Sequence, residues 1–307
     1  MKIQNNNEKA NFTSSGEMVY NRPQSNKFNQ LLSILSFNLF KPKPVVSVLR
    51  LEGVIGKVGI GQSGLTLESM DKLITKAFEK DCLQAVCLVI NSPGGSPVQS
   101  ELIAKRITYL AQEKGVPVYS FVEDVAASGG YWLACAGDEI YASVSSIIGS
   151  IGVTSRGFGF AEAIKKIGIE RRVYTQGKNK SVLDPFKEEQ QKDIDIVKSI
   201  QKDIHQSFIN HVKNSRSNRL TQDDEILFNG EFWSGQVALD YGLIDGIDDL
   251  YSFINNKFGK KVKIEPIKNK QPWFKKTLGI DSLLGRFTDS LINSADNRIN
   301  NNKFDLS

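Results

Sequence analysis

The sequence predicts an α/β fold in which a largely parallel sheet is covered by helices. Helical and strand patterns alternate along the central residues, and the expected strands are continuous apolar runs. Strands that are apolar on both faces are typical of parallel sheets, because the crossover helices bury both sides. With 307 residues, 40% of them hydrophobic and 24% charged, the chain is long enough to bury such a core.

The expected elements follow one another closely from residue 45 onward. They are a strand at 45–55, a helix at 67–80 with one apolar stripe, a strand at 85–90, a helix at 98–113, a strand at 116–122 and a helix at 187–214. We expect three parts: a flexible basic N-terminal segment with a short apolar patch (1–44), the folded domain (45–250) and a basic C-terminal extension (251–307).

Both ends of the chain carry net positive charge. Residues 1–44 hold six basic and two acidic residues, and residues 256–307 hold eleven and five. No basic face with interleaved aromatic residues is seen in the acidic body, so we expect no nucleic-acid partner. Amphipathic patterns at 28–40 and 277–295, flanked by lysines, suggest peripheral contact with an anionic membrane. The alternative is that these apolar stripes pack on the body or on a neighbouring subunit.

No apolar run reaches the roughly 20 residues that span a bilayer, and the patch at 28–40 lies too far along to be a signal peptide. We therefore expect a cytoplasmic protein or one peripheral at the inner membrane. The cysteines Cys82, Cys87 and Cys135 show no metal-ligand spacing, and we expect Cys87 and Cys135 to be buried free thiols. Neither a metal nor another cofactor is expected.

A glycine-rich turn follows the second expected strand. Residues 89–96 read Val-Ile-Asn-Ser-Pro-Gly-Gly-Ser, so a buried strand runs into a Pro-Gly-Gly turn before a helix. Glycines let the main chain turn with positive φ and approach a substrate closely. Their N–H groups can face a developing oxyanion. The alternative is an ordinary strand–helix turn, since a short glycine motif alone is weak evidence.

A serine stands at the apex of the next turn. Residues 124–134 read Asp-Val-Ala-Ala-Ser-Gly-Gly-Tyr-Trp-Leu-Ala, which places Ser128 between a strand and a helix. A serine in that position exposes its hydroxyl, and the N–H of Gly129 can join an oxyanion hole. The alternative is that Ser128 caps the helix.

Such a serine needs a base within hydrogen-bond reach. The two histidines, His205 and His211, both fall in the helix expected at 187–214. His211 follows the apolar stripe and is expected to pack, whereas His205 lies about 100° around the helix and is expected to be exposed. Lysine serves as the base where an apolar site lowers its pKa. Composition does not select one lysine among many.

Several segments, in order and at similar spacing, resemble the signal peptide peptidase A (protease IV) family of Ser–Lys peptidases. They are residues 91–96, 124–131, 149–153, 177–186 and 230–245. Ordered motifs of this kind are far more specific than any one of them. The family's long form holds two copies of the domain and often begins with a spanning helix. This chain, with one copy, is similar to the short form, whose subunits assemble into a ring.

The resemblance implies a role for five residues. Ser128 is the implied nucleophile, Lys180 its general base, and Ser150 the residue that orients the lysine. Gly95 and Gly129 match the positions whose N–H groups form the oxyanion hole. The implied fold is of the Clp protease/crotonase type, built of stacked ββα units. The implied substrates are signal peptides and other short, apolar, unfolded peptides.

Alternatives remain for the base and for the activity. Lys178 lies in the same polar segment as Lys180, and only the alignment of residues 184–186 favours Lys180. A relative of the Clp proteolytic subunit would need a histidine soon after its nucleophile, and an enoyl-CoA hydratase relative would work through carboxylates. A third alternative is a catalytically silent, membrane-associated scaffold of the same fold. Labelling of Ser128 by a serine-directed probe discriminates the peptidase from this scaffold.

Overall fold

The computed structural model describes residues 43–57 and 64–268. The chain divides into a unit of residues 1–43 and a unit of residues 44–307, and the second contains nearly all of the described residues. The amphipathic patterns at 28–40 and 277–295 lie outside the described residues.

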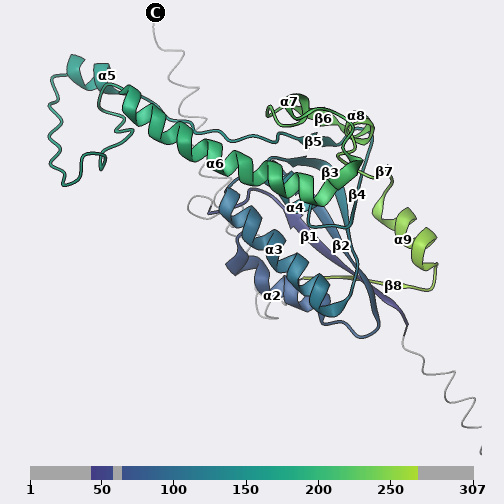
Figure 1. Ribbon diagram of the computed structural model, residues 1–307. Helices are drawn as coiled ribbons and strands as arrows, with labels where there is room; N and C mark the ends of the chain where they lie inside the picture. The colour runs from purple at the N-terminus through teal and green to yellow at the C-terminus, as the bar shows by residue number, and fades with distance from the viewer. Residues whose placement is uncertain (1–42, 58–63, 269–307) are drawn as a thin grey trace, which may run out of the picture. The chain divides into compact units, whose positions relative to one another are not determined.

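A predominantly parallel sheet forms the centre of the second unit (Figure 1). Its strands are β1 (Val45–Glu52), β2 (Leu83–Ser92), β3 (Val118–Ala127), β4 (Glu139–Ala142), β5 (Ile147–Gly149), β6 (Phe232–Ser234), β7 (Gly246–Ile247) and β8 (Lys263–Pro266). The main path runs β6-β5-β3-β2-β1-β8, and β4 pairs with β3 and β7. Only the β5–β6 pair is antiparallel among the described strand pairs. The predicted α/β fold class is confirmed.

Helices cover both faces of this sheet. They are α2 (Leu67–Phe78), α3 (Pro97–Lys114), α4 (Gly129–Ala134), α5 (Ala161–Lys166), α6 (Gln191–Arg216), α7 (Asp224–Leu227), α8 (Gly235–Asp240) and α9 (Leu250–Phe258). Along β2, Val86, Leu88 and Ile90 join the cluster that contains α2 and α3, whereas Ala85 and Cys87 join the cluster around α9. Burial on both sides explains why this strand is a continuous apolar run.

Capping residues account for the limits of α3. Ser96 Oγ accepts a hydrogen bond from the Gln99 N–H, Pro97 occupies the first turn, and Gly115 ends the helix with φ of +63°. Proline at the start and a left-handed glycine at the end are the residues that these positions favour.

The sheet extends beyond the domain boundary expected at residue 250. β8, Lys263–Pro266, pairs with β1 and forms an edge strand of the sheet.

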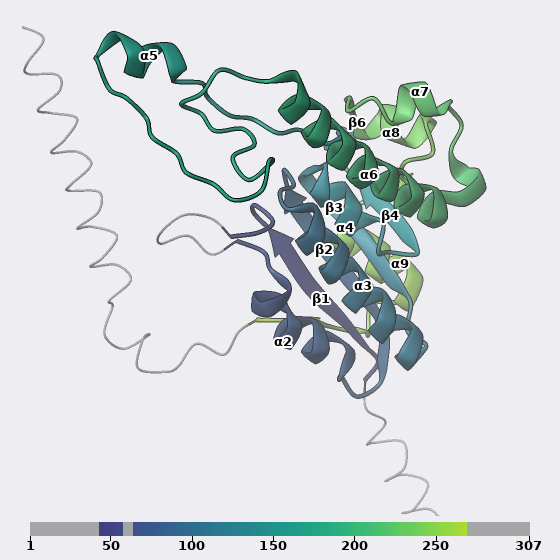
Figure 2. The same cartoon turned by 60° about the vertical axis from the view of Figure 1, so that its left-hand side comes forward.

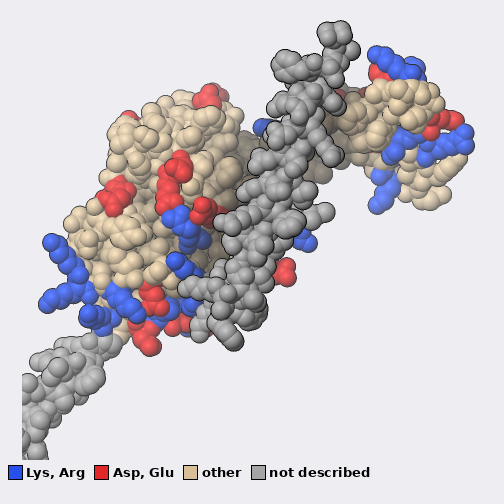
Figure 3. All heavy atoms as spheres, turned by 180° about the vertical axis from the view of Figure 1, so that it is seen from behind, with Lys and Arg blue, Asp and Glu red and all other residues tan. Residues whose placement is uncertain are grey.

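Charges of both signs are interspersed on the surface. On the face seen in Figure 3, Lys and Arg side chains lie among Asp and Glu side chains over the described body. Mixed charge of this kind is typical of a solvated surface.

A buried ion pair ties the end of α6 to the body. The fully buried Arg216 donates from Nη1 and Nη2 to the two carboxylate oxygens of Asp245, over 2.7 and 3.0 Å, and from Nε to the Gly242 carbonyl. Burial alone would raise the pKa of Asp245. The hydrogen bonds from Arg216 and from the Ile140 N–H outweigh it and hold this pKa below its usual value.

We expect Asp245→Asn to destabilise the fold by about 3–5 kcal/mol at pH 7, because it leaves the buried Arg216 unpaired. The native pKa of Asp245 is depressed, so its stabilisation is present above the unfolded pKa of about 3.9 and is lost as pH falls through the native pKa. The free energies of unfolding of wild type and Asp245→Asn, measured with denaturant, should therefore become closer below about pH 4. The exposed Asp223→Asn is the control, and an equal loss in both variants would contradict this role.

Candidate active site

Ser128 occupies the turn between β3 and α4 in a strained conformation. Its φ and ψ are +51° and −121°, and its N–H donates to the Gly149 carbonyl over 2.8 Å. The side chain is half-buried and makes no capping hydrogen bond to α4. Non-glycine residues in such conformations are costly and cluster at functional sites. The helix-cap interpretation of Ser128 is therefore wrong, since its hydroxyl is left available for chemistry.

The glycine-rich turn after β2 packs directly against Ser128. A Cβ added to Gly94, whose φ is +100°, would lie 2.9 Å from Ser128 Cβ and 2.8 Å from the Gly129 nitrogen. A Cβ added to Gly95 would lie 2.0 Å from the Ile55 carbonyl oxygen. Only glycine fits where two main chains approach so closely. The two turns predicted from separate motifs thus form one structure.

Two main-chain N–H groups in these turns are free to bind an anion. Among the turn and loop hydrogen bonds of residues 43–57 and 64–268, neither Gly95 nor Gly129 donates its N–H. A Cβ placed on Gly129 would lie 3.4 Å from the Gly95 nitrogen, so the two groups are neighbours. Preorganised donors of this kind stabilise the negative charge that develops in acyl transfer.

Ser150 lies beside Ser128 because β3 and β5 are paired. Ala127 is opposite Gly149 in that parallel pair, so each serine follows directly after its strand. Ser150 also has a positive φ, of +52°, and its N–H donates to the Glu231 carbonyl over 2.6 Å. Four of the five predicted site residues are therefore gathered at adjoining turns.

Lys180 lies elsewhere, on the segment of residues 154–190 that precedes α6, here called the arm. Figures 1 and 2 show this segment, with α5 at its tip, standing apart from the sheet. Lys180 is exposed, and its N–H donates to the Gly177 carbonyl over 3.1 Å in a turn. Within the described part of the chain, no hydrogen bond joins Lys180 to Ser128 or Ser150. The predicted dyad stays a prediction.

The arm has an internal scaffold next to Lys180. The side chain of Asp184, which is 5% exposed, accepts a hydrogen bond from Arg171 Nε over 2.9 Å, and the same guanidinium lies over the Phe186 ring. Phe186 also packs against Phe160, with ring centroids 5.7 Å apart. Residues 184–186, whose alignment selected Lys180, thus supply the contacts that hold this part of the arm together.

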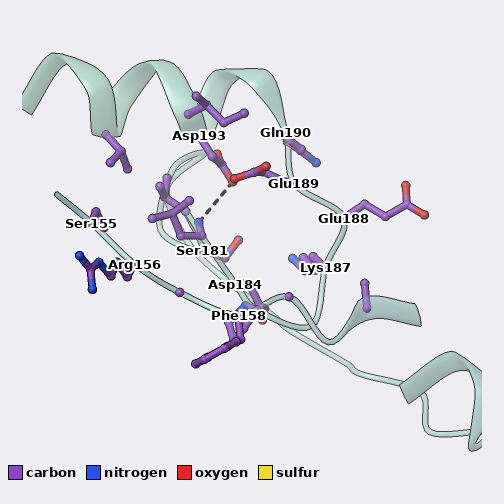
Figure 4. A pocket seen from close by; sticks show the side chains of 18 of the residues that line it. Ser155, Arg156, Phe158, Ser181, Asp184, Lys187, Glu188, Glu189, Gln190 and Asp193 are labelled. Atoms are coloured by element: carbon purple, nitrogen blue, oxygen red, sulfur yellow. Dashed lines mark hydrogen bonds between the residues drawn. The ribbon is translucent and has the colours of Figure 1, made fainter. Parts of the chain in front are cut away.

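A hollow of about 670 Å³ lies within the arm and the start of α6 (Figure 4). Asp193 of α6 points to the loop there and accepts a hydrogen bond from the Leu183 N–H over 3.4 Å. Lys178 lines this hollow, whereas Lys180 does not. Ser128 is also absent from its lining, so the hollow does not contain the predicted nucleophile.

The other nucleophilic and basic candidates are two cysteines and two histidines, all buried or half-buried. As predicted, Cys87 and Cys135 are buried free thiols, and burial raises the pKa of Cys87 to about 12 and of Cys135 to about 11. His211 packs as predicted, stacked on Trp132. The expectation that His205 is exposed was wrong. It is half-buried, because its Nε2 donates to the Ile151 carbonyl, a contact that helical periodicity does not reveal.

Comparison with known proteins identifies the family. A model of Peptidase family S49 matches residues 110–263, which is half of the chain. A Haemophilus influenzae protein named Protease 4 is 32% identical over 220 residues, a match that covers 68% of this chain and 34% of that protein. The chain belongs to Peptidase family S49, the signal peptide peptidase A family predicted from its motifs.

Two further matches are a second curated protein and a solved structure. A Brucella melitensis protein named Na(+)/H(+) antiporter NhaA is 51% identical over 224 residues, covering 73% of this chain and 30% of that protein. The chain thus spans about a third of the length of these two curated relatives. A solved mutant of 1510-N, a membrane-bound stomatin-specific protease, is 17% identical with a TM-score of 0.46, covering 75% of this chain and all of that one.

Over the described ranges, 43–57 and 64–268, none of the helices has the length and apolar character to cross a membrane.

Proposed function

We propose that this chain is a serine endopeptidase in which Ser128 is the nucleophile and Lys180 the general base. The observation that carries the proposal is the strained Ser128 turn. Its hydroxyl makes no capping hydrogen bond to α4, and the neighbouring Gly95 and Gly129 donate their N–H groups to no acceptor in the part of the chain that the structure describes. The family membership favours a peptidase over the catalytically silent scaffold. The substrates are signal peptides and other short, apolar, unfolded peptides.

The proposed reaction proceeds through an acyl-enzyme. Lys180, in its neutral form, takes the Ser128 hydroxyl proton as Oγ bonds to the peptide carbonyl carbon, and the carbonyl electrons form an oxyanion that Gly95 and Gly129 bind. The C–N bond then breaks, and the Lys180 ammonium gives its proton to the departing amine. Water attacks the ester, Lys180 accepts the water proton, and Ser128 regains a proton as the acid leaves. Ser150 orients the lysine.

We further propose that the site is completed in a homo-oligomeric ring, where the arm of one subunit reaches the Ser128 turn of its neighbour. Exposed apolar side chains on the arm support this: Phe158 is 81% exposed, Tyr174 92% and Ile167 69%. Exposed apolar patches mark sites of interaction with a partner when they are large and contiguous. Contacts that repeat head to tail and close produce rings.

A serine-directed fluorophosphonate tests the proposal. We expect it to label Ser128 of the full chain in a single adduct and to stop hydrolysis of short apolar peptides in parallel. Mass spectrometry of the digested protein locates the adduct. A chain that is folded and assembled but takes no label at Ser128, and cleaves no peptide, would instead be the silent scaffold.

A further inference from the structure

Both histidines of the chain hydrogen-bond to main-chain carbonyls next to the two serine turns. His205 Nε2 lies 3.1 Å from the carbonyl oxygen of Ile151, the residue after Ser150. His211 Nε2 lies 2.9 Å from the carbonyl oxygen of Trp132, in the helix that begins after Ser128. A carbonyl oxygen only accepts, so each Nε2 carries the proton and donates it.

The helix that holds these histidines also continues the arm. α6 has 26 residues, Gln191–Arg216, and so extends over about 39 Å. Its first turns line the hollow of the arm, and its last turns are fixed to the body by the Arg216–Asp245 pair. One continuous helix therefore connects the segment that bears Lys180 to the turns that bear Ser128 and Ser150.

The serine turns need such external support. Ser128 and Ser150 both have positive φ, and non-glycine residues keep such conformations only where their surroundings hold them. Ser150 is held on its N-terminal side by the bond from its N–H to Glu231, and Ile151 is fully buried. The His205 bond to the Ile151 carbonyl holds the C-terminal side. Ser128 is tied to the same turn through the bond from its N–H to Gly149.

We infer that His205 and His211 are positioning residues that fix the two serine turns to α6. This inference rests on the proposed function, in which Ser128 and Ser150 act together with Lys180. Neither histidine touches the reacting atoms. His205 sets the position of Ser150 through Ile151, and His211 sets the axis of α4 through Trp132, on which its ring also stacks with centroids 5.0 Å apart. Burial lowers the pKa of His211, so the donor there is a neutral imidazole near pH 7.

His205 gives the sharper test, because its contact with Ile151 is a hydrogen bond, whereas His211 also stacks on Trp132. In the full chain, His205→Gln keeps a side-chain N–H donor at about the distance of the imidazole Nε2. His205→Asn is polar but too short to reach, and His205→Leu has no donor. We expect kcat for an apolar peptide to fall about 10- to 100-fold in the Asn and Leu variants, with KM changed less than about threefold. The Gln variant should stay within about threefold of wild-type kcat.

Hydrogen exchange provides a readout that needs no peptidase activity. The main-chain amides of residues 149–152 should exchange faster in the Asn and Leu variants than in wild type or the Gln variant, with the thermal unfolding midpoint unchanged. Unchanged kcat and exchange in the Leu variant would overturn the inference. So would a Gln variant as inactive as Leu, which would mean that the imidazole itself takes part in the reaction. Absence of Ser128 labelling in wild type would reject the proposed function instead. The exchange data would still show whether His205 fixes the Ser150 turn to α6.

Discussion

Replacing Ser128 by Ala is expected to reduce kcat for peptide hydrolysis by about 10⁴- to 10⁶-fold, as loss of a catalytic nucleophile does. The hydroxyl makes no capping hydrogen bond to α4, so its removal leaves the structure around it without an unsatisfied partner. Steady-state kinetics with a short apolar peptide measure the effect, and native mass spectrometry checks that assembly is unchanged. Ser145→Ala, at an exposed serine in the turn before β5, is the matched control and should keep wild-type kcat.

The strain at Ser128 makes this prediction sharper. Because φ is +51° there, Ser128→Gly should be equally inactive but more stable than Ser128→Ala by about 1 kcal/mol. Denaturant unfolding of the two variants measures the difference. An active Ser128→Ala variant would exclude the serine mechanism. If Ser128→Gly were inactive but less stable than Ser128→Ala, backbone strain at residue 128 would not explain the stability of the turn.

The parts of the fold that could be predicted are those in which one local pattern determines one element. The run of buried residues in β2 and the proline and glycine at the ends of α3 are cases of this kind. The pairing of β3 with β5, which places Ser150 next to Ser128, is not encoded locally. Resemblance to a family supplied that neighbourhood, and the structure brings the two turns together.

Other features of the site depend on three-dimensional contacts that no sequence period reveals. Ser128 and Ser150 both have positive φ, which main-chain hydrogen bonds maintain. The Ser128 N–H donates to the Gly149 carbonyl and the Ser150 N–H to the Glu231 carbonyl, so each bond joins residues far apart in the sequence. The contact between His205 and the Ile151 carbonyl spans 54 positions. Helical periodicity places a side chain on one side of a helix, but it does not identify the segment packed there.

Replacing Lys180 by Ala is expected to abolish hydrolysis nearly as completely as loss of Ser128, because residues of one catalytic unit fail together. Lys178→Ala should keep kcat within about threefold, since only a solvated charge on the same polar segment is lost. Lys180→Arg should be inactive too, because a guanidinium stays protonated. An inactive Lys178→Ala beside an active Lys180→Ala would reverse the assignment.

Mixing inactive subunits tests where the lysine acts. Ser128→Ala and Lys180→Ala subunits, unfolded and reassembled together in equal amounts, should recover activity if the arm of one subunit serves the Ser128 turn of the next. A site that pairs an intact serine with a neighbour's intact lysine then arises in about a quarter of random contacts within a closed ring. Subunit exchange is verified by native mass spectrometry of differently tagged chains. Exchange without recovered activity would place Lys180 beside Ser128 of its own subunit, which would require the exposed arm to fold back onto its own body.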